Sequence, residues 1–133
     1  MKNNLKSFVR KALVFVCAAV MTLGICACAS KGQKITIEVT GPDGTTKSYT
    51  QKTEADNLLD AIDDFKNITV DGSFSEYGFY MTSVNGVEAD WDADNAYWAV
   101  YVNGDYGQYS LDNQPITEGD TYSLVYEISY GQG

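Results

Sequence analysis

The chain has 133 residues, with 18 acidic against nine basic side chains, no histidine and a formal net charge of −9. A chain of this length holds one domain at most, and its negative charge excludes nucleic acid as a partner because phosphate backbones repel an acidic surface. The sequence contains no histidine base, nucleophile motif or phosphate-binding loop, so we expect a protein that is not an enzyme.

The first segment has the pattern of a secretory signal peptide. Residues 1–11 carry four basic side chains and no acid, and an apolar run follows from Ala12 to Ile25. This run is too short to span a bilayer comfortably as a helix, which favours a cleaved signal peptide over a membrane anchor. We therefore predict a signal peptide at residues 1–27.

The end of the apolar run, Ile25-Cys26-Ala27-Cys28, resembles the lipobox of bacterial lipoproteins. Cys28 fits lipidation better than Cys26, because small Ala27 precedes it whereas branched Ile25 precedes Cys26. Two acyl chains give stable membrane anchoring, so the resemblance implies a lipoprotein at the extracytoplasmic face of the bacterial cell membrane. Residues 28–33 are then the lipidated cysteine and its tether. Cleavage removes four basic residues and no acid, which moves the formal charge from −9 to −13.

The mature chain opens with a predicted hairpin and then a predicted helix. Polar and apolar residues alternate over residues 35–40, the turn-forming stretch 41–44 follows, and residues 45–51 return as a second strand. Thr53 is the expected N-cap of the helix, with Asp56 three residues on in a capping-box-like arrangement. Three helical turns are predicted to bury one apolar face, made by Leu58, Leu59, Ile62 and Phe65.

Short strands and turns are predicted next. The composition Asp-Gly-Ser at residues 71–73 favours a turn, residues 78–84 favour a strand, and Asn85-Gly86 favours a second tight turn. Residues 87–95 form a predicted acidic loop that contains Trp91.

Three aspartates of this loop, Asp90, Asp92 and Asp94, alternate in the spacing with which calcium loops begin. The rest of an EF-hand loop is missing, because Asn95 stands where the glycine belongs and Tyr101 where the bidentate glutamate belongs. Two interpretations stay open: a solvated acidic loop, or a low-affinity Ca²⁺ site made by these carboxylates.

A tyrosine-rich hairpin that begins at Tyr97 is the candidate ligand site. Residues alternate strictly along its first strand, with Trp98, Val100 and Val102 on the expected core face and tyrosines on the other. Asn103-Gly104 then predicts a tight turn. Exposed aromatic rings can bind a flat ligand or a sugar, although aromatic residues are also ordinary strand formers. The candidate ligand-binding residues are Tyr97, Tyr101, Asn103, Gly104, Asp105 and Tyr106.

A last strand is predicted over residues 121–129, which completes the order hairpin, helix and several strands. We therefore predict an α+β domain at residues 34–130, a β-grasp-like mixed sheet with one helix packed across it. A small antiparallel sandwich with an incidental helix is the alternative. A domain of this size can form one core without disulfides.

The mature chain also resembles the transcobalamin C-terminal-like domain family of bacterial secreted proteins and lipoproteins. Four stretches carry the resemblance: NLLDAI, GFYMTSVNGVEADWD, YWAVYVNG and ITEGDTYSLVYE. The resemblance implies a β-grasp-like fold. It also implies a corrinoid (cobalamin) ligand, because the corresponding domain of cobalamin carriers closes over a corrinoid with residues of its hairpin. Those carriers add a large helical barrel that this chain lacks, and no histidine is present to coordinate cobalt.

Two functional hypotheses follow. The first is a lipid-anchored module that captures a small molecule, a corrinoid being the implied ligand, on the aromatic hairpin. The alternative is a non-catalytic cell-surface interaction or adhesion module that binds a protein or glycan partner, for example through a sheet edge.

Overall fold

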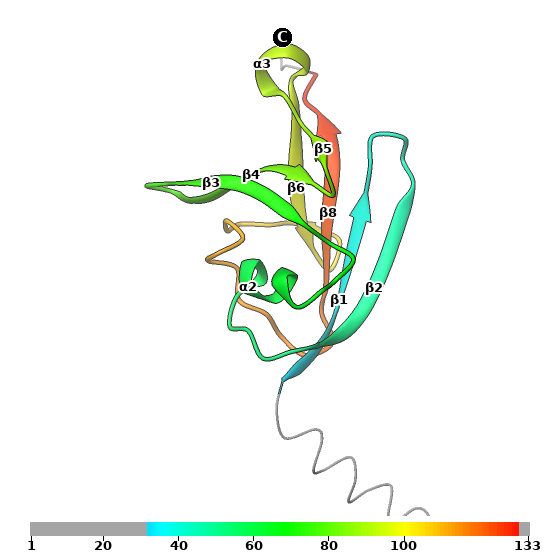
Figure 1. Ribbon diagram of the computed structural model, residues 1–133, viewed down its shortest axis with the longest axis vertical. Helices are drawn as coiled ribbons and strands as arrows, with labels where there is room; N and C mark the ends of the chain where they lie inside the picture. Colours follow the sequence, from blue (N-terminus) through cyan, green and yellow to red (C-terminus); the bar gives the residue numbers. More distant parts are fainter. Residues whose placement is uncertain (1–31, 131–133) are drawn as a thin grey trace, which may run out of the picture. The chain divides into compact units, whose positions relative to one another are not determined.

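The computed structural model describes residues 32–130 (Figure 1). The predicted signal peptide at residues 1–27 and the predicted lipidation site Cys28 lie outside these residues. The described residues belong to one compact unit that begins at Gly32. Within the described part of the chain, no helix is long and apolar enough to cross a membrane.

The larger of two sheets has five strands in the order β2-β1-β8-β6-β7 (Figure 1). β1 runs parallel to β8, whereas the other neighbouring pairs are antiparallel, so the predicted mixed sheet is confirmed. The strands are β1 (Gln33–Thr40), β2 (Thr46–Thr53), β6 (Ala96–Val102), β7 (Asp105–Tyr106) and β8 (Thr121–Ile128).

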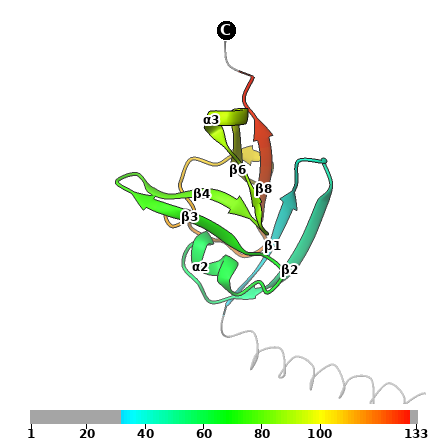
Figure 2. The same cartoon turned by 45° about the horizontal axis from the view of Figure 1, so that its top comes forward.

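The second sheet has three strands in the order β3-β4-β5, and Figure 2 shows its β3–β4 hairpin reaching outward above α2. The predicted turn at residues 71–73 is wrong, because these residues lie inside β3. A register shift between Asp71 and Gly72 marks a bulge there. A Cβ at Gly72 would lie 2.0 Å from the Tyr80 carbonyl oxygen, so the close strand approach requires glycine. The strands are β3 (Val70–Ser75), β4 (Gly78–Val84) and β5 (Val87–Glu88).

The main helix is α2 (Leu58–Asp63), which makes fewer than two turns instead of the predicted three. Its N-cap is Asn57, whose side-chain oxygen accepts from the Asp60 backbone N–H at 2.9 Å. The predicted start at Thr53 is wrong, because that residue ends β2 and pairs with Gln33 of β1. Phe65 is buried as expected, but it follows the helix instead of lying within it.

The predicted acidic loop at residues 87–95 contains a second short helix, α3 (Trp91–Asp94).

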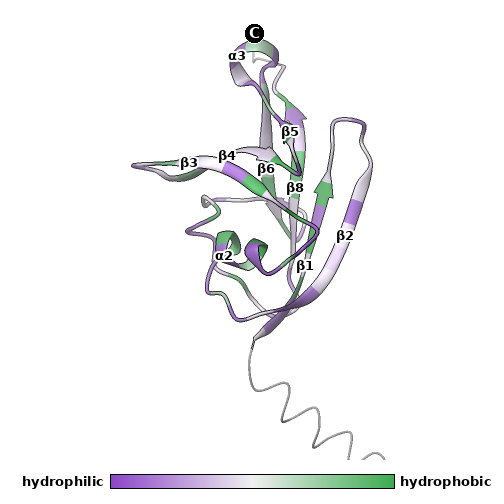
Figure 3. Ribbon diagram, viewed as in Figure 1, coloured by the Kyte–Doolittle hydropathy of each residue, from purple (hydrophilic) through white to green (hydrophobic). Residues whose placement is uncertain are grey.

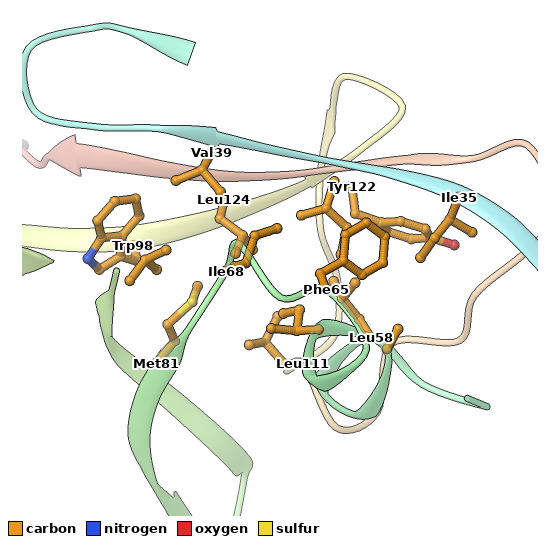
Figure 4. Packing of buried hydrophobic residues seen from close by; sticks show 14 of the residues in the cluster. Ile35, Val39, Leu58, Phe65, Ile68, Met81, Trp98, Leu111, Tyr122 and Leu124 are labelled. Atoms are coloured by element: carbon orange, nitrogen blue, oxygen red, sulfur yellow. The ribbon is translucent and has the colours of Figure 1, made fainter. Parts of the chain in front are cut away.

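The core gathers residues from both sheets and from α2 (Figure 4). Figure 3 shows hydrophobic residues on α2, β1 and β4, whereas β2 carries polar ones along its length. Among the described residues, the buried members of this cluster lie between Ile35 and Leu124. The largest of these fully buried side chains are Tyr122, Ile35, Ile37, Leu58, Ile62, Leu111, Leu124 and Val84.

Candidate functional site

The predicted hairpin turn at residues 103–104 is confirmed. Asn103 and Gly104 both have positive φ angles, 52° and 89°, and connect β6 to β7. The Asn103 side chain serves the fold: its oxygen accepts from the Thr121 N–H at 2.9 Å, and its amide donates to Asp120 Oδ1 at 3.0 Å. Both ends of this amide therefore tie the turn to the start of β8.

The two faces of β6 divide as the sequence predicts. Trp98 is only 6% exposed and belongs to the core, against which Val100 and Val102 pack. Tyr97 and Tyr101 point to the opposite face and are half-buried, whereas Tyr106 of β7 is 55% exposed. Of the tyrosines proposed to meet a ligand, Tyr106 is thus the most accessible.

Glu127 of β8 organises the tyrosines of this face. It lies directly opposite Tyr97 in the ladder, and the Tyr97 hydroxyl donates to its Oε1 at 3.1 Å. The Tyr101 hydroxyl donates to its Oε2. Alternation along the last strand places Glu127 on the face away from Leu124, but nothing in the sequence pattern indicates its contact with the two tyrosines.

Burial and the hydrogen bonds to Glu127 raise the pKa of both phenols. Burial, followed by the hydrogen bond to Glu127, raises the pKa of Tyr97. The same carboxylate raises the pKa of Tyr101 to about 12, with burial as the second cause. Both hydroxyl groups therefore stay protonated throughout the physiological pH range and can donate these hydrogen bonds.

Edge-to-face contacts extend this cluster into an aromatic row, which we define as Trp91, Tyr97, Tyr101 and Tyr106. The ring centroids of Tyr101 and Tyr106 are 5.5 Å apart, and those of Trp91 and Tyr97 are 6.1 Å apart. Both separations lie in the range of favourable aromatic pairs. The row includes three of the predicted site residues and adds Trp91 from α3.

A cleft of about 170 Å³ lies between β4 and β6, and we call it the β4–β6 cleft. It lies beside the stretch of β6 that precedes Tyr101, where β7 no longer pairs with β6. Six aromatic residues line it: Phe79, Tyr80, Tyr97, Trp98, Tyr106 and Tyr109. The other lining residues are Met81, Ala99, Val100, Gly107 and Leu111.

The β4–β6 cleft brings together two predicted site residues, Tyr97 and Tyr106. The other four predicted residues, Tyr101, Asn103, Gly104 and Asp105, do not line it. Phe79 and Tyr80 were not among the predicted site residues, because they lie on a strand of the second sheet.

Two contacts hold the walls of the β4–β6 cleft. The Phe79 N–H donates to Asp112 Oδ1 at 2.8 Å, and the Gly107 N–H donates to the Val100 carbonyl at 2.7 Å. The bond from Phe79, followed by one from the Ser110 hydroxyl, lowers the pKa of Asp112. The carboxylate of Asp112 is therefore ionised at neutral pH and fixes the segment after β7 to β4.

A second cleft of about 470 Å³ lies between the β1–β2 turn and the β4–β5 turn, and we call it the hairpin cleft. Pro42, Lys47 and Asn85 are among its walls. Trp98 lines both clefts, and its indole N–H donates to the Val87 carbonyl at 2.9 Å. This residue therefore lies beneath two separate surface hollows.

The three aspartates proposed to bind Ca²⁺ do not form a metal site in this structure. Asp90 is the N-cap of α3, and its Oδ1 accepts from the Ala93 N–H at 3.0 Å. Asp92 and Asp94 follow inside the helical turn, where residues two apart point in different directions. Within residues 32–130, no group of three or more acidic or cysteine side chains is placed to hold a metal ion.

Fold and site together define a small mixed α+β domain with an aromatic surface cleft. The chain belongs to the protein family described as Domain of unknown function (DUF4430), which matches residues 53–127, more than half of the sequence. The search of curated proteins found no match to this chain.

Two solved structures are similar in fold. The first is from Ruminococcus gnavus ATCC 29149 and is named a "putative metal binding protein"; it has a TM-score of 0.67 at 28% identity and covers 74% of this chain and 99% of its own. The second is haptocorrin in complex with Cbi (cobinamide), with a TM-score of 0.63 at 13% identity over 72% of this chain. This chain spans only 25% of haptocorrin, so the likeness to the transcobalamin-type carriers is a loose one of fold.

Proposed function

We propose that this protein is a lipid-anchored, extracytoplasmic module that binds a small ligand at the β4–β6 cleft and the exposed end of the aromatic row. The observation that carries the proposal is the cleft, where five aromatic residues from the two sheets, the half-exposed Tyr106 among them, meet Tyr109 of the segment after β7. Concave, mostly apolar hollows with a few polar groups are the usual places for small molecules. The proposed architecture is β-grasp-like, with α2 lying across the mixed sheet.

A corrinoid is the ligand class that the fold comparison favours, because haptocorrin, which has a similar fold, was solved in complex with cobinamide. The β4–β6 cleft measures about 170 Å³, well below the roughly 300–1,000 Å³ of pockets that enclose drug-sized ligands. A corrinoid would therefore lie over Tyr106 and Tyr109 and insert only a peripheral group between them. The proposal includes no Ca²⁺ site, because Asp90 caps α3 instead of converging with its neighbours.

Titration with cobinamide tests the corrinoid proposal. We expect saturable quenching of tryptophan fluorescence in residues 29–133, because Trp98 lines the cleft. Tyr106→Ala should weaken binding about 30-fold, the effect of removing a central aromatic contact worth about 2 kcal/mol. Tyr77→Ala is the matched control, since Tyr77 is 84% exposed and lies outside the cleft. A flat titration, or equal loss in both variants, would rule out corrinoid binding at this face.

Lipid anchoring has its own test, in which Cys28 and Cys26 serve as a matched pair. In a bacterial host grown with a labelled fatty acid, we expect Cys28→Ala to abolish incorporation of label and to release the protein from the membrane fraction. Cys26→Ala should leave both unchanged, because a small residue still precedes Cys28. Label retained in Cys28→Ala and lost in Cys26→Ala would move the anchor to the other cysteine.

A cell-surface interaction module remains the second candidate function, and the β3–β4 hairpin is the observation that favours it. Phe74 is 69% exposed and Tyr77 is 84% exposed, and the Phe74 ring contacts Phe79 with centroids 5.2 Å apart. Exposed apolar groups that gather on one projecting element are typical of a partner contact. A protein or glycan partner would then bind this hairpin rather than the cleft, so Tyr77→Ala would weaken capture by that partner.

A further inference from the structure

The walls of the β4–β6 cleft are aromatic and uncharged. Six of its lining residues carry aromatic side chains, and none is a lysine, arginine, aspartate or glutamate. The face of an aromatic ring is electron-rich and attracts a cation within about 6 Å of the ring centroid. A neutral aromatic lining can therefore hold a positive charge without an ion pair.

Carboxylates lie one hydrogen bond behind these walls. Glu127 accepts from the hydroxyl of Tyr97, and Asp112 accepts from the backbone N–H of Phe79. A phenol that donates to a carboxylate has a more electron-rich ring, which strengthens its attraction for a cation. Both acids add negative potential at the cleft without occupying it.

The charge of the surrounding chain has the same sign. After Lys66 the sequence contains eleven acidic residues and not one lysine or arginine. Lys47 lines the hairpin cleft, whereas no lysine lines the β4–β6 cleft. An anionic ligand would therefore find no basic side chain among the walls of the β4–β6 cleft, whereas the acidic character of the chain favours a cation.

The size of the cleft limits the ligand further. A volume of about 170 Å³ suits an ammonium group with a few alkyl substituents. An added peptide strand is disfavoured, because the Ala96 N–H already donates to Asp90 and the Val100 carbonyl already accepts from Gly107. Only a short stretch around Trp98 is left on this edge, and strand addition needs a longer row of backbone groups.

We propose that the β4–β6 cleft binds a small alkylated ammonium compound, not attached to a peptide, through cation–π contacts with its aromatic walls. The inference rests on the proposed small-ligand function, and it names a small cation as the ligand that fits inside the cleft, in place of the larger corrinoid that the fold comparison favours.

The test compares choline with its neutral isostere 3,3-dimethylbutan-1-ol, which has the same shape without the charge. Both are titrated into residues 29–133 and followed by the NMR shifts of the Gly107 and Tyr109 amides. We expect choline to bind at least about tenfold more tightly than the alcohol, the ratio for a partly desolvated cation–π contact. Tyr109→Leu should weaken choline binding about fivefold or more, whereas Tyr109→Phe, which keeps the ring, should bind within about twofold of the parent.

The matched control is Tyr77→Leu, which removes an exposed tyrosine outside the cleft and should bind choline like the parent. Equal affinity for choline and the alcohol, no saturable binding of either, or unchanged binding in Tyr109→Leu would overturn the inference. Its failure is separable from that of the proposed function: saturable cobinamide binding without choline binding leaves the small-ligand function standing and removes only the cation. Binding of neither compound at this face removes both.

Discussion

Replacing Gly78 with alanine is expected to lower the free energy of unfolding by about 2–5 kcal/mol, the combined cost of backbone strain and a steric clash. Gly78 has a φ angle of +106°, which L side chains rarely adopt. A Cβ there would lie 2.3 Å from Ser110 Oγ and 2.9 Å from Asp112 Oδ1. The added methyl group would therefore push the segment after β7 away from the start of β4.

Gly86→Ala is the matched control for Gly78→Ala. Gly86 also has a positive φ angle, +80°, but no atom lies within 4 Å of the position its Cβ would take. This variant should cost about 1 kcal/mol, the strain of the backbone alone. Urea denaturation followed by circular dichroism measures both values. Equal losses in the two variants would show that the contact with Ser110 and Asp112 contributes nothing beyond strain.

Gly78→Ala should also impair the candidate site. The residue after Gly78 is Phe79, whose N–H donates to Asp112, so the clash acts on the contact that holds one wall of the β4–β6 cleft. Adding Ser110→Ala to Gly78→Ala removes the hydroxyl oxygen nearest to the new Cβ. We expect this double variant to recover part of the lost stability, and a purely additive double variant would contradict the proposed clash.

Patterns confined to one strand could be predicted from the sequence. The alternation around Trp98 gives the correct core face of β6, because Trp98, Val100 and Val102 belong to or pack against the core cluster and a slip by one residue would expose the indole. The Asn103-Gly104 turn is correct for a similar local reason, since both residues tolerate the positive φ angles that a tight hairpin requires.

The start of α2 could not be predicted, because two neighbouring residues can cap a helix. Thr53 and Asn57 both carry suitable side chains, and the choice depends on how far β2 extends along β1. Pairing of Gln33 with Thr53 keeps the latter in the sheet, and its hydroxyl then accepts from the Ala55 N–H at 3.1 Å. The helix therefore begins four residues later, after Asn57.

Only some of the residues that line the β4–β6 cleft could be predicted from the sequence. Tyr97 and Tyr106 belong to one hairpin, which local pattern identifies, whereas Phe79 and Tyr80 arrive on a strand of the other sheet. The contact that fixes them joins Phe79 to Asp112, 33 residues further along the chain. No periodicity encodes a contact between residues so far apart, so the cleft emerges only once both sheets are in place.

Replacing Trp98 with alanine is expected to lower the free energy of unfolding by about 3–5 kcal/mol, the usual cost of truncating a large buried aromatic side chain. The indole is 6% exposed, contacts the Tyr126 ring with centroids 5.5 Å apart, and donates to the Val87 carbonyl. Trp98→Phe keeps most of the packing and loses that hydrogen bond, so it should cost about 1–3 kcal/mol. For a domain of this size each kcal/mol lowers the melting temperature by about 4–8 °C, which calorimetry resolves.

The second tryptophan provides the control, because the chain contains only Trp91 and Trp98. Trp91 is 50% exposed on α3, so Trp91→Ala should cost no more than about 1 kcal/mol. The pair also locates a bound ligand: Trp98→Phe leaves Trp91 as the single tryptophan, and Trp91→Ala leaves Trp98. A ligand in the β4–β6 cleft should change the emission of Trp98 in Trp91→Ala, since Trp98 lines the cleft and Trp91 does not. A change confined to Trp91 would place the ligand at the far end of the aromatic row, beside Tyr97 and outside the cleft.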